Sequence, residues 1–198
     1  GAWAGKLLAD MGADVIKVEP PAGSLTRTYA PFYKDVPHRD RSLTYWHYNT
    51  SKRGITLDLD QEAGREAFRR LVASADVLIE DQAPGRMAAW GLDYPDLSAL
   101  NPKLIMTSIT PFGRSGPRST EQATDLTLLA GGGPVWSCGY DDHSLPPVRG
   151  GGNQGYQTGC HWAVVTTLIA VLHRDFTGEG QHLDVNMHAA QNVTTEAR

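Results

Sequence analysis

The chain has 198 residues, of which 40% are hydrophobic and 20% charged, and its formal net charge at pH 7 is −4. This composition is typical of a globular protein with one or two domains. The acidic balance argues against a broad basic surface for nucleic acid or anionic lipid. The cysteines Cys138 and Cys160 form no CxxC motif, so we expect a reducing, cytoplasmic compartment. The longest apolar run, residues 163–172, is shorter than the ~20 residues of a membrane span, and no membrane association is expected.

The first part of the chain predicts a helix, a strand and a long loop. Leu7, Leu8 and Met11 fall on one face of an opening helix, and residues 15–18 form a short apolar strand. Residues 20–54 are rich in proline, tyrosine and charge, and they predict an extended excursion over the surface. Loops of that length are uncommon unless they have a role.

A strand–helix–strand unit follows the predicted loop. Residues 55–59 alternate as a strand, Asp60 is the predicted helix N-cap, and residues 77–79 form the next strand. The apolar residues between them recur at the helical spacing i, i+3, i+4 and i+7, namely Phe68, Leu71, Val72 and Ala75.

The second half of the chain continues the alternation. We expect a short helix over residues 94–101, a strand over 103–109, a long helix over about 156–173 and a strand over 182–187, with a final helix beginning after it. Alternation of this kind predicts an α/β fold whose mostly parallel, open sheet is covered by helices.

A glycine-rich segment precedes the long helix. Gly150, Gly152 and Gly155 match the GxGxxG pattern, and Asp175 lies 20 residues beyond the last of them, as in a dinucleotide-binding fingerprint. That fingerprint requires a strand before the glycines, whereas two prolines at residues 146–147 stand there, and proline suits a strand badly. A NAD-binding Rossmann protein remains an alternative on this pattern.

Other chemical motifs are weak. The segment GAWAGK is too short for a P-loop. The sequence has no GxSxG motif, so no serine nucleophile of that type is expected. It has no HExxH motif either, and no metal site is expected. Asp81, Gln82 and Gly85 follow the strand at residues 77–79, and open α/β sheets bind ligands beyond the carboxyl ends of their strands. The residues alone therefore predict an α/β protein with a site built from loops.

Several segments together go further than any single motif. The chain resembles the class III CoA-transferases (the CaiB/BaiF family, which includes formyl-CoA and carnitine CoA-transferases) over nearly its whole length. The segments that carry the resemblance occur in the order LLADMGADVIKVEPPAG, NTSKRGITLDL, ADVLIEDQAPG, GLDYPDLSALNPKLIMTSITPFGRSGP and LHRDFTGEGQHLDVNM.

The resemblance implies a Rossmann-like large domain and an interlocked dimer. Because members of this family are longer, it also implies that residues 1–198 are a large domain truncated at its N-terminus, without the small domain and the C-terminal return segment. The implied reaction moves CoA from an acyl-CoA donor to a carboxylic acid, with CoA as substrate and no tightly bound cofactor. In this family an aspartate attacks the donor thioester, and a mixed anhydride and then an aspartyl-CoA thioester follow.

The resemblance also shows where this chain departs from the family. Counting back without gaps from LIAVLHRDFTGEGQ places Gln157 at the position of the family's catalytic aspartate, and Gly159 matches the glycine two places on. A shift of one residue supplies no carboxylate, since the sequence has no Asp or Glu between residues 143 and 175. An amide is a poor nucleophile, so this position is expected to lack the transfer chemistry.

The remaining site residues also follow from the resemblance. Leu57 matches a position against the adenine, and Asp81 and Gln82 replace the family's asparagine and aromatic residue near the CoA. Asp125 is a nearby acid whose simpler role is a helix N-cap or a structural carboxylate. The complete set of residues predicted to contact CoA is Leu57, Asp81, Gln82, Gly85, Arg86 and Trp90.

Three interpretations remain open. The chain belongs to a subunit that lacks the nucleophile and pairs, in a homodimer or heterodimer, with an aspartate-bearing paralogue. Alternatively, it is an active enzyme that uses another nucleophile, for which Asp125 is the nearby candidate. The third interpretation is a non-catalytic protein that binds acyl-CoA.

Overall fold

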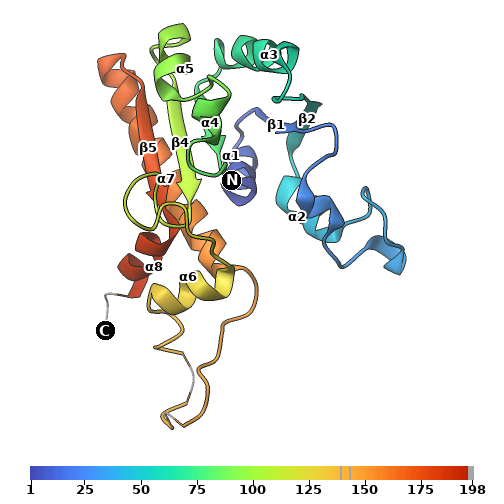
Figure 1. Cartoon of the computed structure of the whole chain (residues 1–198), viewed down its shortest axis with the longest axis vertical. Coiled ribbons are helices and arrows are strands. Elements are labelled where there is room, and N and C mark those ends of the chain that lie inside the picture. Colours follow the sequence, from blue (N-terminus) through green and yellow to red (C-terminus); the bar gives the residue numbers. More distant parts are fainter. Residues whose placement is uncertain (139, 143, 196–198) are drawn as a thin grey trace.

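A computed structural model describes residues 1–138, 140–142 and 144–195 (Figure 1). The helices are α1 (Ala2–Asp10), α2 (Leu43–Asn49), α3 (Glu62–Val72), α4 (Arg86–Ala89), α5 (Tyr94–Leu100), α6 (Asp125–Gly131), α7 (Gln154–Thr177) and α8 (Met187–Thr195), with short 3-10 turns η1 (Leu25–Thr28) and η2 (Tyr33–Asp35). The strands are β1 (Val15–Glu19), β2 (Lys52–Thr56), β3 (Val77–Glu80), β4 (Ile105–Thr110) and β5 (Gln181–Asn186).

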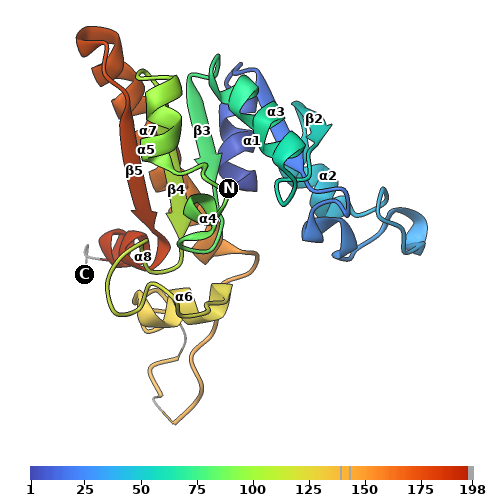
Figure 2. The ribbon, with the colours of Figure 1, turned by 45° about the horizontal axis from the view of Figure 1, so that its top comes forward.

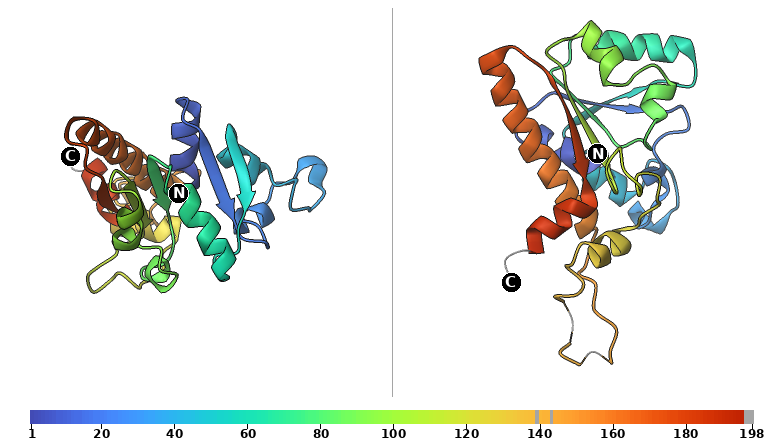
Figure 3. Two further views of the ribbon diagram at one scale, coloured as in Figure 1. Left: turned by 90° about the horizontal axis from the view of Figure 1, so that it is seen from above. Right: turned by 60° about the vertical axis from the view of Figure 1, so that its left-hand side comes forward.

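The described strands form two parallel sheets rather than the single sheet expected. β1 pairs with β2, and a second sheet has the order β3-β4-β5. No described strand pairs with both β1 and β3, and α1 stands between them (Figure 2 and Figure 3, left). The predicted class, parallel α/β with flanking helices, is confirmed.

Strand β4 lies at the centre of the larger sheet and is buried along its length. On one face, Ile109 packs in a hydrophobic cluster with α7, and the Thr107 hydroxyl lies 2.7 Å from that of Thr167 on this helix. On the other face, Met106 packs in a second cluster with Leu97 of α5. Figure 2 shows α5 and α7 on opposite sides of β4. The sheet is thus covered on both faces, which accounts for the burial of every residue of β4, its hydroxyl residues Thr107, Ser108 and Thr110 included.

The first strand–helix unit differs from its prediction in register. β2 covers Lys52–Thr56 rather than residues 55–59, because its partner β1 ends at Glu19, and Pro20 follows. Asp60 is not the N-cap of α3: Gln61 holds that position without a side-chain bond. Helix α3 ends at Val72, so Ala75 lies in the following turn.

The predicted excursion over residues 20–54 contains regular structure. Helix α2 begins after Ser42, whose hydroxyl accepts a hydrogen bond from the Tyr45 backbone N–H as an N-cap. The same serine hydroxyl donates to backbone carbonyls of Thr26 and Tyr29, which fixes the preceding loop against the helix. The predicted excursion therefore contains a helix in its second half.

The other predicted elements are present with small shifts of their ends. Strands β4 and β5 and helix α5 lie where they were expected, and α7 is longer than predicted at both ends. In α1, Leu7 and Leu8 pack against the core, but Met11 is the exposed C-cap residue. Within the described part of the chain, none of the helices has the length and apolar character needed to span a bilayer.

Candidate functional site

Asp125 holds the start of α7 from a neighbouring helix. One carboxylate oxygen accepts the backbone N–H groups of Gly155 (2.7 Å) and Tyr156 (3.3 Å), and the other accepts Arg149 Nη1 (3.1 Å). Asp125 is only 5% exposed. Thr124, not Asp125, is the N-cap of α6, so of the two roles expected for Asp125 its contacts fit a structural carboxylate. Asp125 instead serves as the cap of α7, whose own N-cap residue Asn153 makes no side-chain cap bond.

The glycines at the start of α7 allow neighbouring elements to approach closely. The Gly155 carbonyl accepts Gln191 Nε2 of α8 at 2.9 Å, and a Cβ on Gly155 would lie 3.1 Å from an Asp125 oxygen. A Cβ on Gly159 would lie 2.5 Å from Met187 Cγ, which is too close for any real contact. These two glycines thus serve packing with α6 and α8.

Gln157 lies in the first turn of α7 and faces α2. Its side chain is half-buried, and Nε2 donates to the Tyr48 hydroxyl oxygen at 3.2 Å. Asn153 Nδ2 approaches the same oxygen at 3.4 Å. Tyr156, one residue earlier, directs its hydroxyl toward the Ala123 carbonyl at 3.4 Å. The first turn of α7 therefore presents amide and phenol groups and no carboxylate.

An aromatic cluster surrounds Tyr48. The ring of Trp3 stacks on His47 (5.8 Å between centroids) and meets Tyr48 (5.7 Å) and His161 (6.0 Å) edge-on. His161 is one helical turn beyond Gln157 on the same face of α7. The sequence analysis missed this cluster because its members come from three separate segments with no shared spacing.

Lys52 fixes the end of α2 against α1. Its ammonium donates to the backbone carbonyls of Ala2 (2.7 Å) and Tyr48 (2.8 Å) and to Asn49 Oδ1 (3.1 Å). Burial, followed by repulsion from Lys17 and Lys6, lowers the pKa of Lys52 to about 8. The side chain thus remains mostly protonated near neutral pH and places a positive charge behind Tyr48.

The residues predicted to follow β3 occupy an exposed loop. Asp81 Oδ2 lies 2.8 Å from the Gly1 nitrogen, and the Gln82 backbone N–H donates to Glu80 Oε2 at 2.7 Å. Burial raises the pKa of Glu80, and hydrogen bonds from Ser108 and the Gln82 backbone oppose that rise in part. The loop is therefore anchored at its start by a buried carboxyl.

The predicted residues Arg86 and Trp90 share one acidic partner. Asp60 Oδ1 accepts Arg86 Nη2 (2.8 Å) and Trp90 Nε1 (2.9 Å), and the Arg86 guanidinium lies 4.5 Å from the centre of the Trp90 ring. Gly85 caps α4 with a φ of 85°, a conformation that favours glycine. Leu57 and Trp90 pack against the same hydrophobic cluster.

The site residues thus form two groups joined by α1. One group lies near β3 and α4 and comprises Leu57, Asp81, Gln82, Gly85, Arg86 and Trp90, and the other lies at the start of α7. The Gly1 nitrogen contacts Asp81 of the first group, while Trp3 contacts Tyr48 in the second. Within the described ranges, no three His, Cys, Asp or Glu side chains are placed to hold a metal ion.

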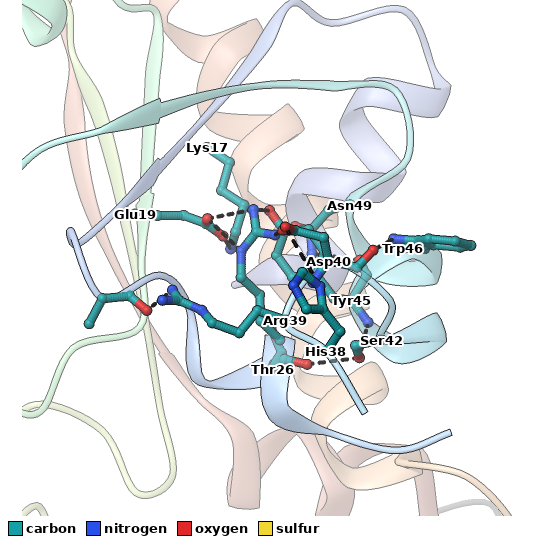
Figure 4. A network of polar contacts seen from close by, with 12 residues as sticks. Lys17, Glu19, Thr26, His38, Arg39, Asp40, Ser42, Tyr45, Trp46 and Asn49 are labelled. Atoms are coloured by element: carbon teal, nitrogen blue, oxygen red, sulfur yellow. Dashed lines mark hydrogen bonds and ion pairs between the residues drawn. The ribbon is translucent and has the colours of Figure 1, made fainter. Parts of the chain in front are cut away.

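A charged network that the sequence analysis missed lines a cleft of about 270 Å³ beside β1 (Figure 4). Arg27 donates to Glu19 Oε2 (2.9 Å), Asp40 Oδ1 (2.9 Å) and the Tyr45 hydroxyl (2.7 Å). Burial raises the pKa of Glu19, but hydrogen bonds from Arg27 and Tyr45 outweigh it and the pKa is lowered overall. Burial and the Glu19 carboxylate raise the pKa of Tyr45 to about 12.

A second polar group connects β4, β5 and the loop after β4. Arg114 donates to Asp93 Oδ2 (2.6 Å) and contacts the His182 ring, whose Nε2 lies 2.9 Å from Ser108 Oγ. Tyr94 stacks on His182 with ring centroids 5.3 Å apart. Burial, followed by the charge of Arg114, lowers the pKa of His182, and the nearby Asp93 and Asp184 oppose this in part.

The lowered pKa of His182 predicts a pH effect on folding. The unfolded chain takes up a proton near the ordinary pKa of 6.5, whereas the folded chain resists it, so stability falls as pH drops below that value. In the variant His182→Gln, the free energy of unfolding measured by urea denaturation should fall less between pH 7.5 and pH 5.5 than it does in the wild type. The replacement of an exposed histidine, His38→Gln, is the control. An equal dependence of the free energy of unfolding on pH in His182→Gln and wild type would contradict this prediction.

Comparison with known proteins identifies the class of this fold and site. The model of CoA-transferase family III matches residues 1–197. The chain therefore belongs to CoA-transferase family III, as the sequence resemblance predicted.

Individual relatives are similar over nearly the whole chain. It is 42% identical to the succinyl-CoA:(R)-benzylsuccinate CoA-transferase subunit BbsE of Thauera aromatica, over 99% of this chain and 47% of that protein. It is 40% identical to the succinate–glutarate CoA-transferase of Agrobacterium fabrum, over 98% of this chain and 48% of that protein. A CAIB/BAIF family crystal structure from Brucella suis superimposes with a TM-score of 0.90 at 35% identity, covering 98% of this chain and 51% of that one. The chain spans about half the length of the curated relatives it matches.

Proposed function

We propose that this chain is the large domain of a CoA-transferase subunit that binds acyl-CoA without supplying the nucleophile. The observation that carries the proposal is the neutral first turn of α7, where Gln157 donates to Tyr48. The transfer needs a carboxylate that attacks the thioester. The neighbouring residues Tyr156 and Thr158 also have no carboxylate. The proposal therefore holds even if the family's catalytic aspartate corresponds to the residue before or after Gln157.

The geometry of Asp125 argues against the alternative nucleophile. One of its oxygens accepts the N–H groups at the start of α7, the other accepts Arg149 from the preceding loop, and the side chain is buried. Attack on a thioester through Oδ1 would weaken the bonds to the N–H groups of Gly155 and Tyr156, and attack through Oδ2 would displace Arg149, so either route costs a hydrogen bond to a buried carboxylate. We therefore assign Asp125 a positioning role and place the nucleophile in a partner, an aspartate-bearing paralogue.

A partner surface lies along α7. The helix has an apolar stripe at helical spacing that no described element covers completely. Exposed apolar surface of this extent is typical of an interface, and it supports a homodimer or heterodimer. The residues of the stripe are Trp162, Val165, Leu168, Ile169, Leu172 and Phe176.

The names of the relatives indicate the substrate class. The relatives from Thauera aromatica and Haloarcula hispanica are named as acting with succinyl-CoA, and the one from Agrobacterium fabrum as acting on succinate and glutarate. We extend this class to the present protein, with an acyl-CoA of a dicarboxylic acid as donor and a carboxylic acid as acceptor. The relation of this chain to the Thauera aromatica subunit rests on their sequence identity.

We place the CoA along the first group of site residues. Arg86 and Trp90 are held together on Asp60, beside the cluster that includes Leu57. The GxGxxG alternative has weaker support, because α6 and not a strand is the described element before Gly150, and because Gly155 is buried inside α7.

Titration calorimetry on the full-length protein tests the proposed ligand. Binding of CoA thioesters is expected and binding of NAD is not. Arg86→Glu should weaken CoA binding about tenfold or more, because an arginine–phosphate hydrogen bond is charge-assisted. Arg70→Glu, on the exposed face of α3, is the matched control. Tight binding of NAD without binding of CoA would replace this proposal with the dinucleotide one.

A further inference from the structure

The hydroxyl of Tyr48 has an unused proton beside Gln157, the position predicted for the family's catalytic aspartate. Its oxygen accepts the side-chain amides of Gln157 (3.2 Å) and Asn153 (3.4 Å). Among the described residues, no acceptor receives the proton of this hydroxyl. A hydroxyl that accepts such bonds is polarised and becomes a stronger donor toward a third group. The O–H of Tyr48 is therefore free to donate a hydrogen bond to a ligand that binds next to Gln157.

The surroundings of Tyr48 fit an anion. The groups that meet its oxygen are N–H donors, and the Lys52 ammonium lies 2.8 Å from its backbone carbonyl. In the same aromatic cluster, the indole N–H of Trp3 is buried and has no hydrogen-bond partner among the described residues. No carboxylate of the described chain bonds to this cluster. Unpaired donors and a nearby cation favour a carboxylate oxygen as ligand.

The position of Tyr48 is fixed before any ligand binds. Its ring packs edge-on against Trp3 and His47, at 5.7 and 5.0 Å between centroids. Lys52 ties the Tyr48 carbonyl to α1 through the Ala2 carbonyl. The side chain is nevertheless half-buried and therefore still reachable from solvent. Preorganised donors of this kind bind without a large ordering cost.

We propose that the Tyr48 hydroxyl, with the Gln157 amide beside it, binds a carboxylate of the substrate. This inference rests on the proposed function and deepens it, because it assigns the residue that recognises the second carboxylate of a dicarboxylic acid. The carboxylate belongs either to the acyl chain of the donor or to the free acceptor acid. Tyr48 contacts the substrate and determines its selection, while the transfer of CoA depends on the nucleophile of the partner.

Succinyl-CoA and butyryl-CoA separate recognition of the carboxylate from recognition of CoA, since a carboxylate in one replaces a methyl group in the other. Calorimetry on the full-length protein, in the assembly it forms, compares wild type with Tyr48→Phe. Succinyl-CoA or free succinate should bind about tenfold or more weakly to the variant, with butyryl-CoA unchanged. Tyr33→Phe is the matched control, because Tyr33 packs on Trp46 away from the site.

The outcomes are distinct. If Tyr48→Phe binds succinyl-CoA more weakly than wild type does, the recognised carboxylate belongs to the donor. If the variant binds only succinate more weakly, the recognised carboxylate belongs to the acceptor. Equal affinities of wild type and Tyr48→Phe for both ligands would overturn the inference, as would equal weakening of butyryl-CoA. If neither thioester binds wild type, the proposed function itself fails. Asn153→Asp is a second variant, and it keeps a residue type suited to the N-cap position of α7. In the wild type the Asn153 amide nitrogen lies 3.4 Å from the Tyr48 oxygen, so a carboxylate at this position should repel succinyl-CoA selectively.

Discussion

Replacement of Asp125 by alanine is expected to lower the free energy of unfolding by about 3 kcal/mol. The carboxylate is 5% exposed and holds the N–H groups of Gly155 and Tyr156 at the start of α7. Its removal leaves the buried Gly155 N–H unpaired and releases Arg149 from its partner. Urea denaturation of the full-length protein should show a lower midpoint with an unchanged slope.

Matched variants separate the cap from the charge. Asp125→Asn keeps an oxygen that accepts the Gly155 N–H and should cost less, about 1 kcal/mol. Asp175→Ala removes an exposed carboxylate from the far end of the same helix and should change stability by less than about 0.5 kcal/mol. An Asp125→Ala protein as stable as Asp175→Ala would show that the cap does not hold α7.

Introduction of an aspartate at position 157 is expected to create a group that reacts with butyryl-CoA, a donor whose acyl chain has no second carboxylate for the new charge to repel. The carboxylate attacks the thioester carbonyl, CoA thiolate leaves, and a mixed anhydride forms on residue 157. Attack of the thiolate on the aspartyl carbonyl then releases the acid and leaves an aspartyl-CoA thioester. Hydroxylamine or borohydride should trap these species on Gln157→Asp, and peptide mass spectrometry should locate the label. An acid is also favourable in the first turn of a helix.

Two further variants control this experiment. Gln157→Asn is neutral and should stay unlabelled, whereas Tyr156→Asp tests the neighbouring register. If only Tyr156→Asp is labelled, the family's catalytic aspartate corresponds to residue 156 instead of residue 157. The claim that this chain lacks the catalytic carboxylate would still hold. Complete rescue of turnover is not expected, since the resemblance implies that Asp81 and Gln82 also depart from the family pattern near the CoA. Labelling of Gln157→Asn would contradict the assigned chemistry.

The elements that depend on local pattern were predictable from the sequence. The apolar residues 104–106 at the start of β4, and the long helical pattern that ends before Gly178, predicted the positions of β4 and α7 to within a few residues. The predictions were wrong for residues whose structure depends on a contact with a distant part of the chain. The register of β2 depends on where β1 ends, and Asp60 bonds Arg86 and Trp90 instead of capping α3.

The site was predictable in part for the same reason. The candidate positions come from the family resemblance, which predicts that Gln157 and Asp125 lie near the reaction centre. The role of Asp125 as the cap of α7 required the structure, because the cap and the helix lie 30 residues apart. The contacts of Tyr48 with Gln157 and Trp3 likewise join three separate segments, and no spacing in the sequence indicates them.

The central claim is that this subunit supplies no nucleophile, and trapping on the wild-type protein tests it most directly. The purified full-length protein is incubated with an acyl-CoA donor and hydroxylamine, alone and mixed with an aspartate-bearing paralogue, and intact masses are measured. We predict that this chain gains no mass in either sample, while the paralogue gains the hydroxamate. A hydroxamate on this chain, at Asp125 or at any other carboxylate, together with CoA transfer by the subunit alone, would contradict the claim.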